Sequence, residues 1–168
     1  MHGRTRSDRF RGEAEYDTIR SICEAIDLPV FANGDIESPQ KAAEVLEITG
    51  ADGLMIGRAA QGNPWIFREI RHYLDTGELL PPPSPMEVLD VMERHLDQLH
   101  LSYGEHSGVR VARRHISWYL NGRPGSAPVR KRQMKTESAT EQFRLLRSYF
   151  RQLDREQEEE KRSDRLAA

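Results

Sequence analysis

Two short apolar stretches, residues 29–35 and 51–58, constrain the fold of this chain more than any other feature of its sequence. Each has the length of a strand, ends in a polar turn that contains glycine, and leads into a helical pattern. Because they lie about one βα repeat apart, they predict consecutive parallel strands. Ser38 and Asn63, each followed by proline, are predicted to cap the helices that come after the strands. This order of helices and strands predicts an α/β fold with right-handed crossovers.

The turns that follow the two strands are candidate binding sites for an anion. Gly34 would let the backbone approach a ligand closely, and Arg58 would add a fixed positive charge. In a (β/α)8 TIM barrel, the loops after the last two strands hold a phosphate in this way. An Asn-Gly-Asp turn alone is more often an ordinary turn, but two such turns at successive strand ends favour a phosphate site. We therefore predict a phosphorylated cofactor or substrate at five residues, namely Asn33, Gly34, Asp35, Gly57 and Arg58.

A proline-rich stretch at residues 80–85 divides the chain and is interpreted as a stiff linker. Residues 1–79 hold the α/β pattern. A complete barrel takes roughly 200 residues or more, so we expect the C-terminal part of a barrel. Residues 86–153 are predicted to form an all-α helical bundle domain, and residues 154–168 a charged tail that is either a frayed helix end or disordered. The helices of that domain are predicted over residues 84–104, over 109–120 and from 138 onward.

A basic segment within the helical domain indicates a polyanion partner. Residues 108–135 hold eight Lys and Arg residues and no acidic residue, a density that favours nucleic acid. A helical wheel places Arg110, Arg113 and Arg114 outside the apolar arc, towards solvent. The aromatic residues Trp118 and Tyr119 are interpreted as core residues rather than as base-stacking groups.

Composition narrows the remaining classes of function. The single cysteine, Cys23, leaves no internal disulfide and favours the cytoplasm. Cys23 lies on the apolar stripe of a helix, so we interpret it as a core residue without a catalytic part. No apolar run approaches the roughly 18 residues of a membrane span, so no membrane partner is expected. We expect no metal site.

Five motifs stand out along the chain, namely His2-Gly3-Arg4-Thr5, the stretch from Pro29 to Ile36, the stretch from Gly50 to Ala60, the stretch from Asn63 to Phe67, and Arg113-Arg114-His115 with Trp118-Tyr119-Leu120. Together they resemble the tRNA-dihydrouridine synthase family, and most of all its bacterial B-type subgroup. The resemblance covers about residues 1–150.

This resemblance implies an FMN-dependent enzyme that reduces the C5=C6 bond of uridine in tRNA to give 5,6-dihydrouridine, with NADPH reducing the flavin. Carried over by position, the five turn residues would bind the phosphate and ribityl end of FMN, and His2 would lie near the flavin ring. Arg4 would face the RNA. The helical domain, with Arg110, Arg113 and Arg114, would hold tRNA by its phosphates. The full-length enzyme is expected to be a cytoplasmic monomer.

The catalytic group of the family has no counterpart in this sequence. In the family, a cysteine in the earlier half of the barrel donates a proton, and a lysine there contacts the flavin. We therefore expect no catalytic residue in this chain, which resembles the C-terminal half of such an enzyme and should be inactive alone. Two alternatives stay open: a non-catalytic RNA-binding fragment, and another FMN-dependent barrel oxidoreductase. The second would have no reason to append a basic helical domain.

Overall fold

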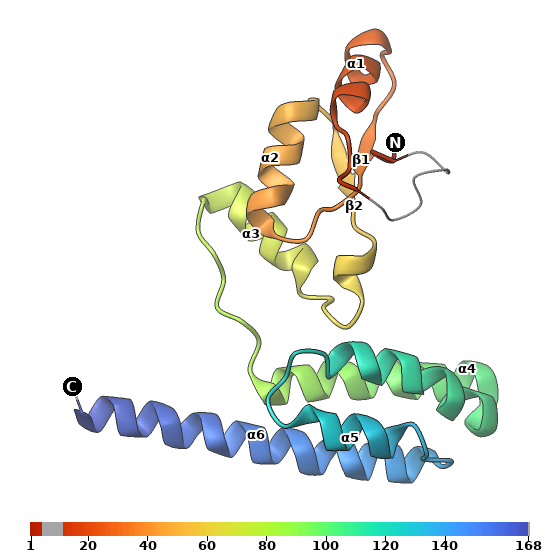
Figure 1. Cartoon of the computed structure of the whole chain (residues 1–168), viewed down its shortest axis with the longest axis vertical. Coiled ribbons are helices and arrows are strands. Elements are labelled where there is room, and N and C mark those ends of the chain that lie inside the picture. Colours follow the sequence, from red (N-terminus) through yellow and green to blue (C-terminus); the bar gives the residue numbers. More distant parts are fainter. Residues whose placement is uncertain (5–11, 168) are drawn as a thin grey trace. The chain divides into compact units, whose positions relative to one another are not determined.

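The computed structural model describes residues 1–4 and 12–167, and the chain divides into two compact units, Met1–Pro81 and Pro82–Ala168 (Figure 1). The boundary falls inside the segment 80–85 that the sequence marks as a linker. Unit 1 contains α1 (Asp17–Ala25), β1 (Phe31–Asn33), α2 (Pro39–Thr49), β2 (Gly53–Met55), the short 3-10 helix η1 (Arg58–Ala60) and α3 (Ile66–Thr76). Unit 2 contains α4 (Pro85–Tyr119), α5 (Ser126–Gln133) and α6 (Ala139–Ala167).

The strands of unit 1 run parallel, as the sequence predicts. β1 pairs with β2 in a register that sets Phe31 beside Gly53. The first residues of the chain lie along the other edge of β1, because the Asn33 N–H donates to the Met1 carbonyl at 2.8 Å and the Gly3 N–H donates to the Asn33 carbonyl at 2.9 Å. His2 forms a parallel bridge with Asn33. Three parallel segments therefore bring their carboxyl ends to one edge of the sheet.

The two faces of this sheet differ because strand side chains alternate. Ala32 is fully buried, and Leu54 packs on the same hydrophobic core. That core holds residues of all three helices, among them Ile19, Val45 and Ile66. Phe31 and Met55 belong to the opposite face and are 55% and 63% exposed. One face of the sheet is thus covered by helices, whereas the other presents apolar side chains to solvent.

Local capping chemistry sets several helix ends. The Ser38 hydroxyl accepts the Lys41 N–H at 3.1 Å at the start of α2, and Gly50 ends that helix with a left-handed φ of 65°. Ser84 begins α4 with a full capping box. The predicted cap at Asn63 is wrong: α3 begins at Ile66, and Asn63 belongs to the turn that precedes it.

Unit 2 is a helical bundle in which α4 bends back on itself. Gly104 has φ 71° and ψ 162°, which breaks α4 into two helical halves. The halves pack together where a Cβ on Gly108 would lie 2.8 Å from His100 Cα. This break confirms the predicted helix end near Gly104, whereas α5 was not foreseen.

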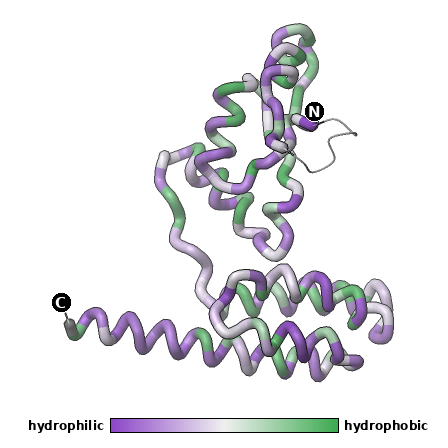
Figure 2. The backbone as a smooth tube through the Cα atoms, viewed as in Figure 1, coloured by the Kyte–Doolittle hydropathy of each residue, from purple (hydrophilic) through white to green (hydrophobic). Residues whose placement is uncertain are grey.

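The charged tail is the end of a helix and is not disordered over its described residues, because α6 continues through Ala167. Its last buried residue is Leu153, and the turns beyond it are hydrophilic (Figure 2). This stretch holds no Gly or Pro and is rich in Glu, Arg and Lys, which are good helix formers. No helix in the described part of the chain is long and apolar enough to cross a membrane.

Candidate anion site and nucleic-acid surface

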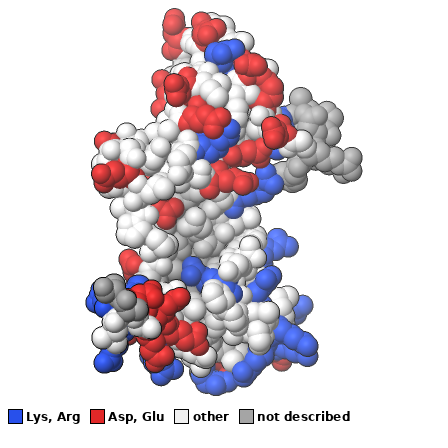
Figure 3. Space-filling view, turned by 60° about the vertical axis from the view of Figure 1, so that its left-hand side comes forward, with Lys and Arg blue, Asp and Glu red and all other residues white. Residues whose placement is uncertain are grey.

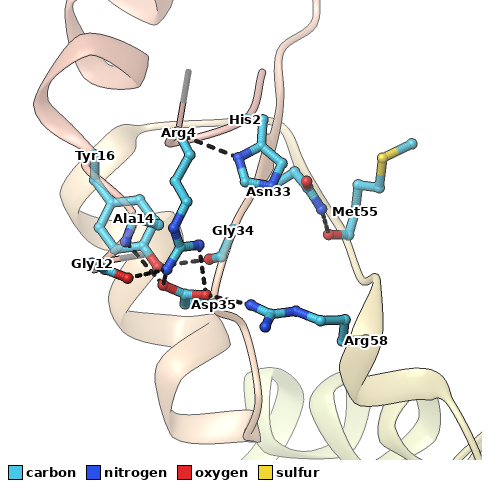
Figure 4. A network of polar contacts seen from close by, with 10 residues as sticks. All are labelled: His2, Arg4, Gly12, Ala14, Tyr16, Asn33, Gly34, Asp35, Met55 and Arg58. Carbon is cyan, nitrogen blue, oxygen red and sulfur yellow. Dashed lines mark hydrogen bonds and ion pairs between the residues drawn. The ribbon is translucent and has the colours of Figure 1, made fainter. Parts of the chain in front are cut away.

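The carboxyl ends of the parallel segments converge on one small pocket of unit 1 (Figure 4). Its volume of about 110 Å³ is below the roughly 300–1,000 Å³ of pockets that enclose a whole ligand, so it suits one end of a ligand. All six residues predicted to bind the cofactor line it, namely His2, Asn33, Gly34, Asp35, Gly57 and Arg58. The structure thus brings together side chains from three separate segments of sequence.

Asp35 is the electrostatic centre of this pocket. Arg4 binds both carboxylate oxygens, with its Nη1 at 2.7 Å from Oδ1 and its Nη2 on Oδ2. Arg58 Nη2 lies 3.0 Å from Oδ1, and the Ala14 N–H donates to Oδ2 at 2.9 Å. The hydrogen bonds from Arg4 lower the pKa of Asp35, helped by the Ala14 N–H and the Arg58 charge. Two guanidinium groups share one carboxylate, so this triad carries a net positive charge. Arg58 is the guanidinium that lines the pocket, and Glu37 adds a second carboxylate to the lining.

The prediction that Arg4 faces RNA differs from this geometry. The Arg4 side chain is only 5% exposed and is turned inward onto Asp35 and the Gly12 carbonyl. Arg58 is 52% exposed, so it is the member of the triad that meets solvent. Arg4 therefore holds Asp35 in place, and Asp35 in turn orients Arg58.

The turn after β1 has a backbone that few residue types adopt. Gly34 has φ 129°, and a Cβ there would lie 2.8 Å from the Ala14 Cβ. Asp35 has φ 49°, in the left-handed region that non-glycine residues rarely occupy. The Tyr16 hydroxyl donates to the Gly34 carbonyl at 2.8 Å. Contacts from distant segments thus hold the turn in an unfavourable conformation, which is common at ligand sites.

Two side chains at the rim have defined orientations. The Arg4 N–H donates to His2 Nδ1 at 3.0 Å, so the neutral ring carries its proton on Nε2. The Asn33 side-chain amide donates to the Met55 carbonyl, which ties it to β2. His2 can therefore offer an N–H to a ligand in the pocket.

A second hollow lies in unit 2, between α4 and α5, and has a volume of about 610 Å³. Arginines dominate its lining, and Figure 3 shows Lys and Arg gathered over unit 2 in the lower part of that view. The lining residues are Arg110, Arg113, Arg114, Ser117, Trp118, Asn121, Arg130 and Met134. Ion pairs among the described residues do not involve Arg110, Arg114 or Arg130. Their charges are therefore available to a polyanion.

The predicted basic residues do not all have the same role. Arg110 and Arg114 are exposed, as predicted. Arg113 is half-buried: its Nη2 donates to the Thr136 carbonyl at 2.7 Å, and its Nε is buried without a hydrogen-bond partner among the described residues. Arg113 thus joins α4 to the loop before α6, and its predicted orientation towards solvent is wrong.

Sequence reasoning missed the uncharged residues of this hollow, namely Ser117, Trp118, Asn121 and Met134. Tyr119 is buried, as predicted, but Trp118 is only half-buried and lines the hollow together with Asn121 and Arg130. A helical spacing of three and four residues from Arg114 through Trp118 to Asn121 was the available signal. The prediction that Trp118 is a core residue is therefore wrong.

The chain thus combines a parallel α/β unit that has a polar pocket at its strand ends with a helical unit that has an arginine-lined hollow. Residues 1–156 match the family model described as dihydrouridine synthase (Dus), and the chain belongs to this family. The resemblance seen in the motifs is thereby confirmed.

Similar proteins include the tRNA-dihydrouridine synthase B of Pseudomonas putida, which is 57% identical over 150 residues that cover 89% of this chain and 44% of that protein. Those of Proteus vulgaris and Yersinia pestis are each 54% identical, over 89% and 91% of this chain and over 46% and 48% of their own lengths. The chain thus spans about half the length of the curated relatives it matches.

Proposed function

We propose that the protein takes part in the reduction of uridine to 5,6-dihydrouridine in tRNA, with FMN as cofactor and NADPH as reductant. The observation that carries the proposal is that one pocket at the carboxyl ends of parallel strands is lined by the five turn residues predicted from the sequence pattern and by His2, which the resemblance added. The relatives are named tRNA-dihydrouridine synthase B, which gives tRNA as their substrate. A C-terminal barrel portion over residues 1–79, a cytoplasmic location and a monomeric full-length enzyme belong to the same proposal.

The pocket residues fit the anionic end of FMN. The triad of Arg4, Asp35 and Arg58 has a net positive charge, and a Cβ on Gly57 would meet no atom within 4 Å, so the backbone there is open to a ligand. The pocket is large enough for a phosphate group but not for the flavin ring. We propose that Arg58 and Gly57 hold the phosphate and that His2 meets the ring through its Nε2–H.

Bound FMN would supply the hydride chemistry of the reduction. This chain's own residues would bind and orient it: Asp35 holds Arg58 at the pocket, and Asn33 is fixed by its bond to β2. We assign no proton donor in this chain. Cys23 packs against the hydrophobic core of unit 1, as predicted. We propose that the donor cysteine belongs to the part of the relatives that this chain does not span, and that turnover requires that part.

The tRNA would contact the arginines of unit 2 through its phosphates. A second candidate function, RNA binding without catalysis, is favoured by one observation: unit 2 has its own buried core, which includes Met92, Ile116 and Phe150. Unit 2 can therefore present its basic surface whether or not unit 1 holds a cofactor.

The cofactor assignment is tested by Arg58→Ala, with FMN binding followed by flavin fluorescence. The substitution removes a charge-assisted contact worth about 1.5–3 kcal/mol, so FMN should bind at least about tenfold more weakly. Arg68→Ala is the matched control, since Arg68 is an exposed arginine of α3 outside the pocket. Equal affinities for the two variants would contradict the site.

The RNA assignment is tested by Arg110→Ala combined with Arg114→Ala, with tRNA binding measured over a range of salt concentrations. Each lost phosphate contact should reduce the salt slope by about one unit, with similar effects for different tRNA sequences. The control replaces Arg94 and Arg144, which pair with Asp90 and Glu141 on the same unit. An unaltered slope in the first variant would remove these arginines from the interface.

A further inference from the structure

The hollow between α4 and α5 combines charge with groups that phosphate binding does not need. Arg110, Arg114 and Arg130 supply charge, whereas Trp118 and Met134 supply apolar surface. Met134 is 53% exposed and Trp118 is half-buried, although both are large and apolar. Arginines alone would suffice for a sugar-phosphate backbone. The apolar lining indicates that part of the ligand is flat or apolar.

The Trp118 ring is held in place before any ligand arrives. It packs edge-on against His115 at 5.0 Å between ring centroids, and His115 packs against His95 at 4.7 Å. His95 Nδ1 lies 3.3 Å from the hydroxyl of the buried Tyr119. Burial lowers the pKa of His95 and of His115, so at neutral pH the pair adds little charge and the arginines dominate the local field. A fixed indole loses little conformational entropy when a planar group stacks on it.

The remaining polar groups can discriminate among planar ligands. Asn121 and Ser117 line the same hollow, so a side-chain amide and a hydroxyl lie within one pocket with the indole. An amide offers both a donor and an acceptor, which matches the hydrogen-bonding edge of a nucleobase. The volume of about 610 Å³ falls in the range of small-ligand pockets, roughly 300–1,000 Å³.

We propose that this hollow takes one unpaired RNA base, stacked on Trp118, with its flanking phosphates on Arg110 and Arg114. The proposal rests on the proposed function, from which it takes RNA as the ligand. In an RNA duplex the bases are stacked inside the helix, so only an unpaired nucleotide of a loop, bulge or end can place its base on an aromatic side chain. The hollow would thus select the shape of the RNA, whereas the arginines supply affinity.

The first experiment uses the full chain with Trp65→Phe, which leaves Trp118 as the single tryptophan of the two in the sequence. Tryptophan fluorescence is titrated with a short single-stranded RNA, a blunt duplex of the same length and inorganic polyphosphate. Single-stranded RNA should quench the fluorescence strongly, because a base stacks on the indole. Equal quenching by duplex RNA or by polyphosphate would overturn the proposal.

The second experiment measures single-stranded RNA binding to Trp118→Leu. Loss of one stacked base should weaken binding by about 5- to 150-fold and leave the salt slope unchanged. Phe67→Leu is the control, since Phe67 is an exposed aromatic residue of unit 1. Circular dichroism verifies that the Trp118 variant is folded. If it is not, Asn121→Ala in the Trp65→Phe background replaces it, and an unchanged preference among bases then overturns the proposal.

The outcomes distinguish failure of the base site from failure of the proposed function. Full-strength binding of single-stranded RNA by Trp118→Leu, with a salt slope that still depends on Arg110 and Arg114, overturns the base site and leaves the proposed function standing. Failure of the unaltered chain to bind any RNA overturns the RNA part of the proposed function, and the base site with it.

Discussion

Among single residues, Asp35 connects three separate segments of unit 1 through its carboxylate. It accepts hydrogen bonds from Arg4, Ala14 and Arg58. The contact with Arg4 lowers the pKa of Asp35. A carboxylate whose pKa is lower in the folded than in the unfolded state stabilises the fold above its unfolded pKa. That contribution is lost as the pH falls through the folded-state pKa.

Asp35→Asn should therefore destabilise unit 1 at neutral pH by about 3 kcal/mol, because it removes the negative charge that binds both Nη atoms of the nearly buried Arg4. Urea denaturation of both proteins at a series of pH values is the measurement. The difference in unfolding free energy should shrink as the pH falls below about 3.9, the unfolded pKa of aspartate. Asp17→Asn is the control: its carboxylate is 76% exposed and pairs with Arg20. A loss no larger than the control's would show that Asp35 does not hold the site together.

The residue scale also shows where prediction from sequence stops. Asn33, Gly34, Gly57 and Arg58 could be predicted to lie close together because each is at the end of a strand or within three residues of it, and strand ends are visible as local patterns. The inward turn of Arg4 was not found, since its partner Asp35 is 31 positions away in the sequence. No local pattern encodes a contact of that separation.

Secondary-structure elements were predictable where capping chemistry is local. Ser38, Gly50 and Ser84 begin or end helices through contacts within four residues, and the cap at Ser38 was predicted. Asn63 has the same sequence signature but lies in a turn, because tertiary packing starts α3 three residues later. For the charged C-terminal part of α6, the sequence left a helix end and disorder both open, and the helix propensity of its residues decides for the helix.

The break in α4 depends on one glycine. Gly104 has φ 71° and ψ 162°, a combination that is almost restricted to glycine. Gly104→Ala should lower the unfolding free energy of unit 2 by about 1–3 kcal/mol. Thermal denaturation followed by circular dichroism measures it. Ser102→Ala, an exposed position of the same helix, should have almost no effect. If both variants melt like the parent chain, the two halves of α4 do not depend on this backbone conformation.

At the scale of the whole molecule, the open face of the sheet in unit 1 exposes large apolar side chains to solvent. Phe31 and Met55 are exposed there, and the outer edges of β2 and of residues 1–3 have no strand partner within residues 1–4 and 12–167. Exposed strand edges beside apolar side chains promote association between chains. The isolated chain should therefore self-associate.

Replacing Phe31 and Met55 together by Ser should reduce this association and lower stability by no more than about 1 kcal/mol, since both side chains are already largely in water. Light scattering during refolding and urea denaturation give the two quantities. Ala32→Ser is the contrast, because Ala32 is fully buried on the covered face and its substitution places a hydroxyl in the core. Unchanged scattering in the double variant would mean that another surface drives association.

The start of the chain has a practical consequence for anyone who expresses this protein. The Met1 amino group donates to the Phe31 carbonyl at 2.6 Å, so the first residue is already part of the sheet edge. An affinity tag fused ahead of Met1 would continue alongside residues 28–30 of the chain, next to the apolar open face of the sheet. The last turns of α6 pack on no buried core residue. A purification tag therefore belongs at the carboxyl terminus, where it leaves the pocket at the strand ends untouched.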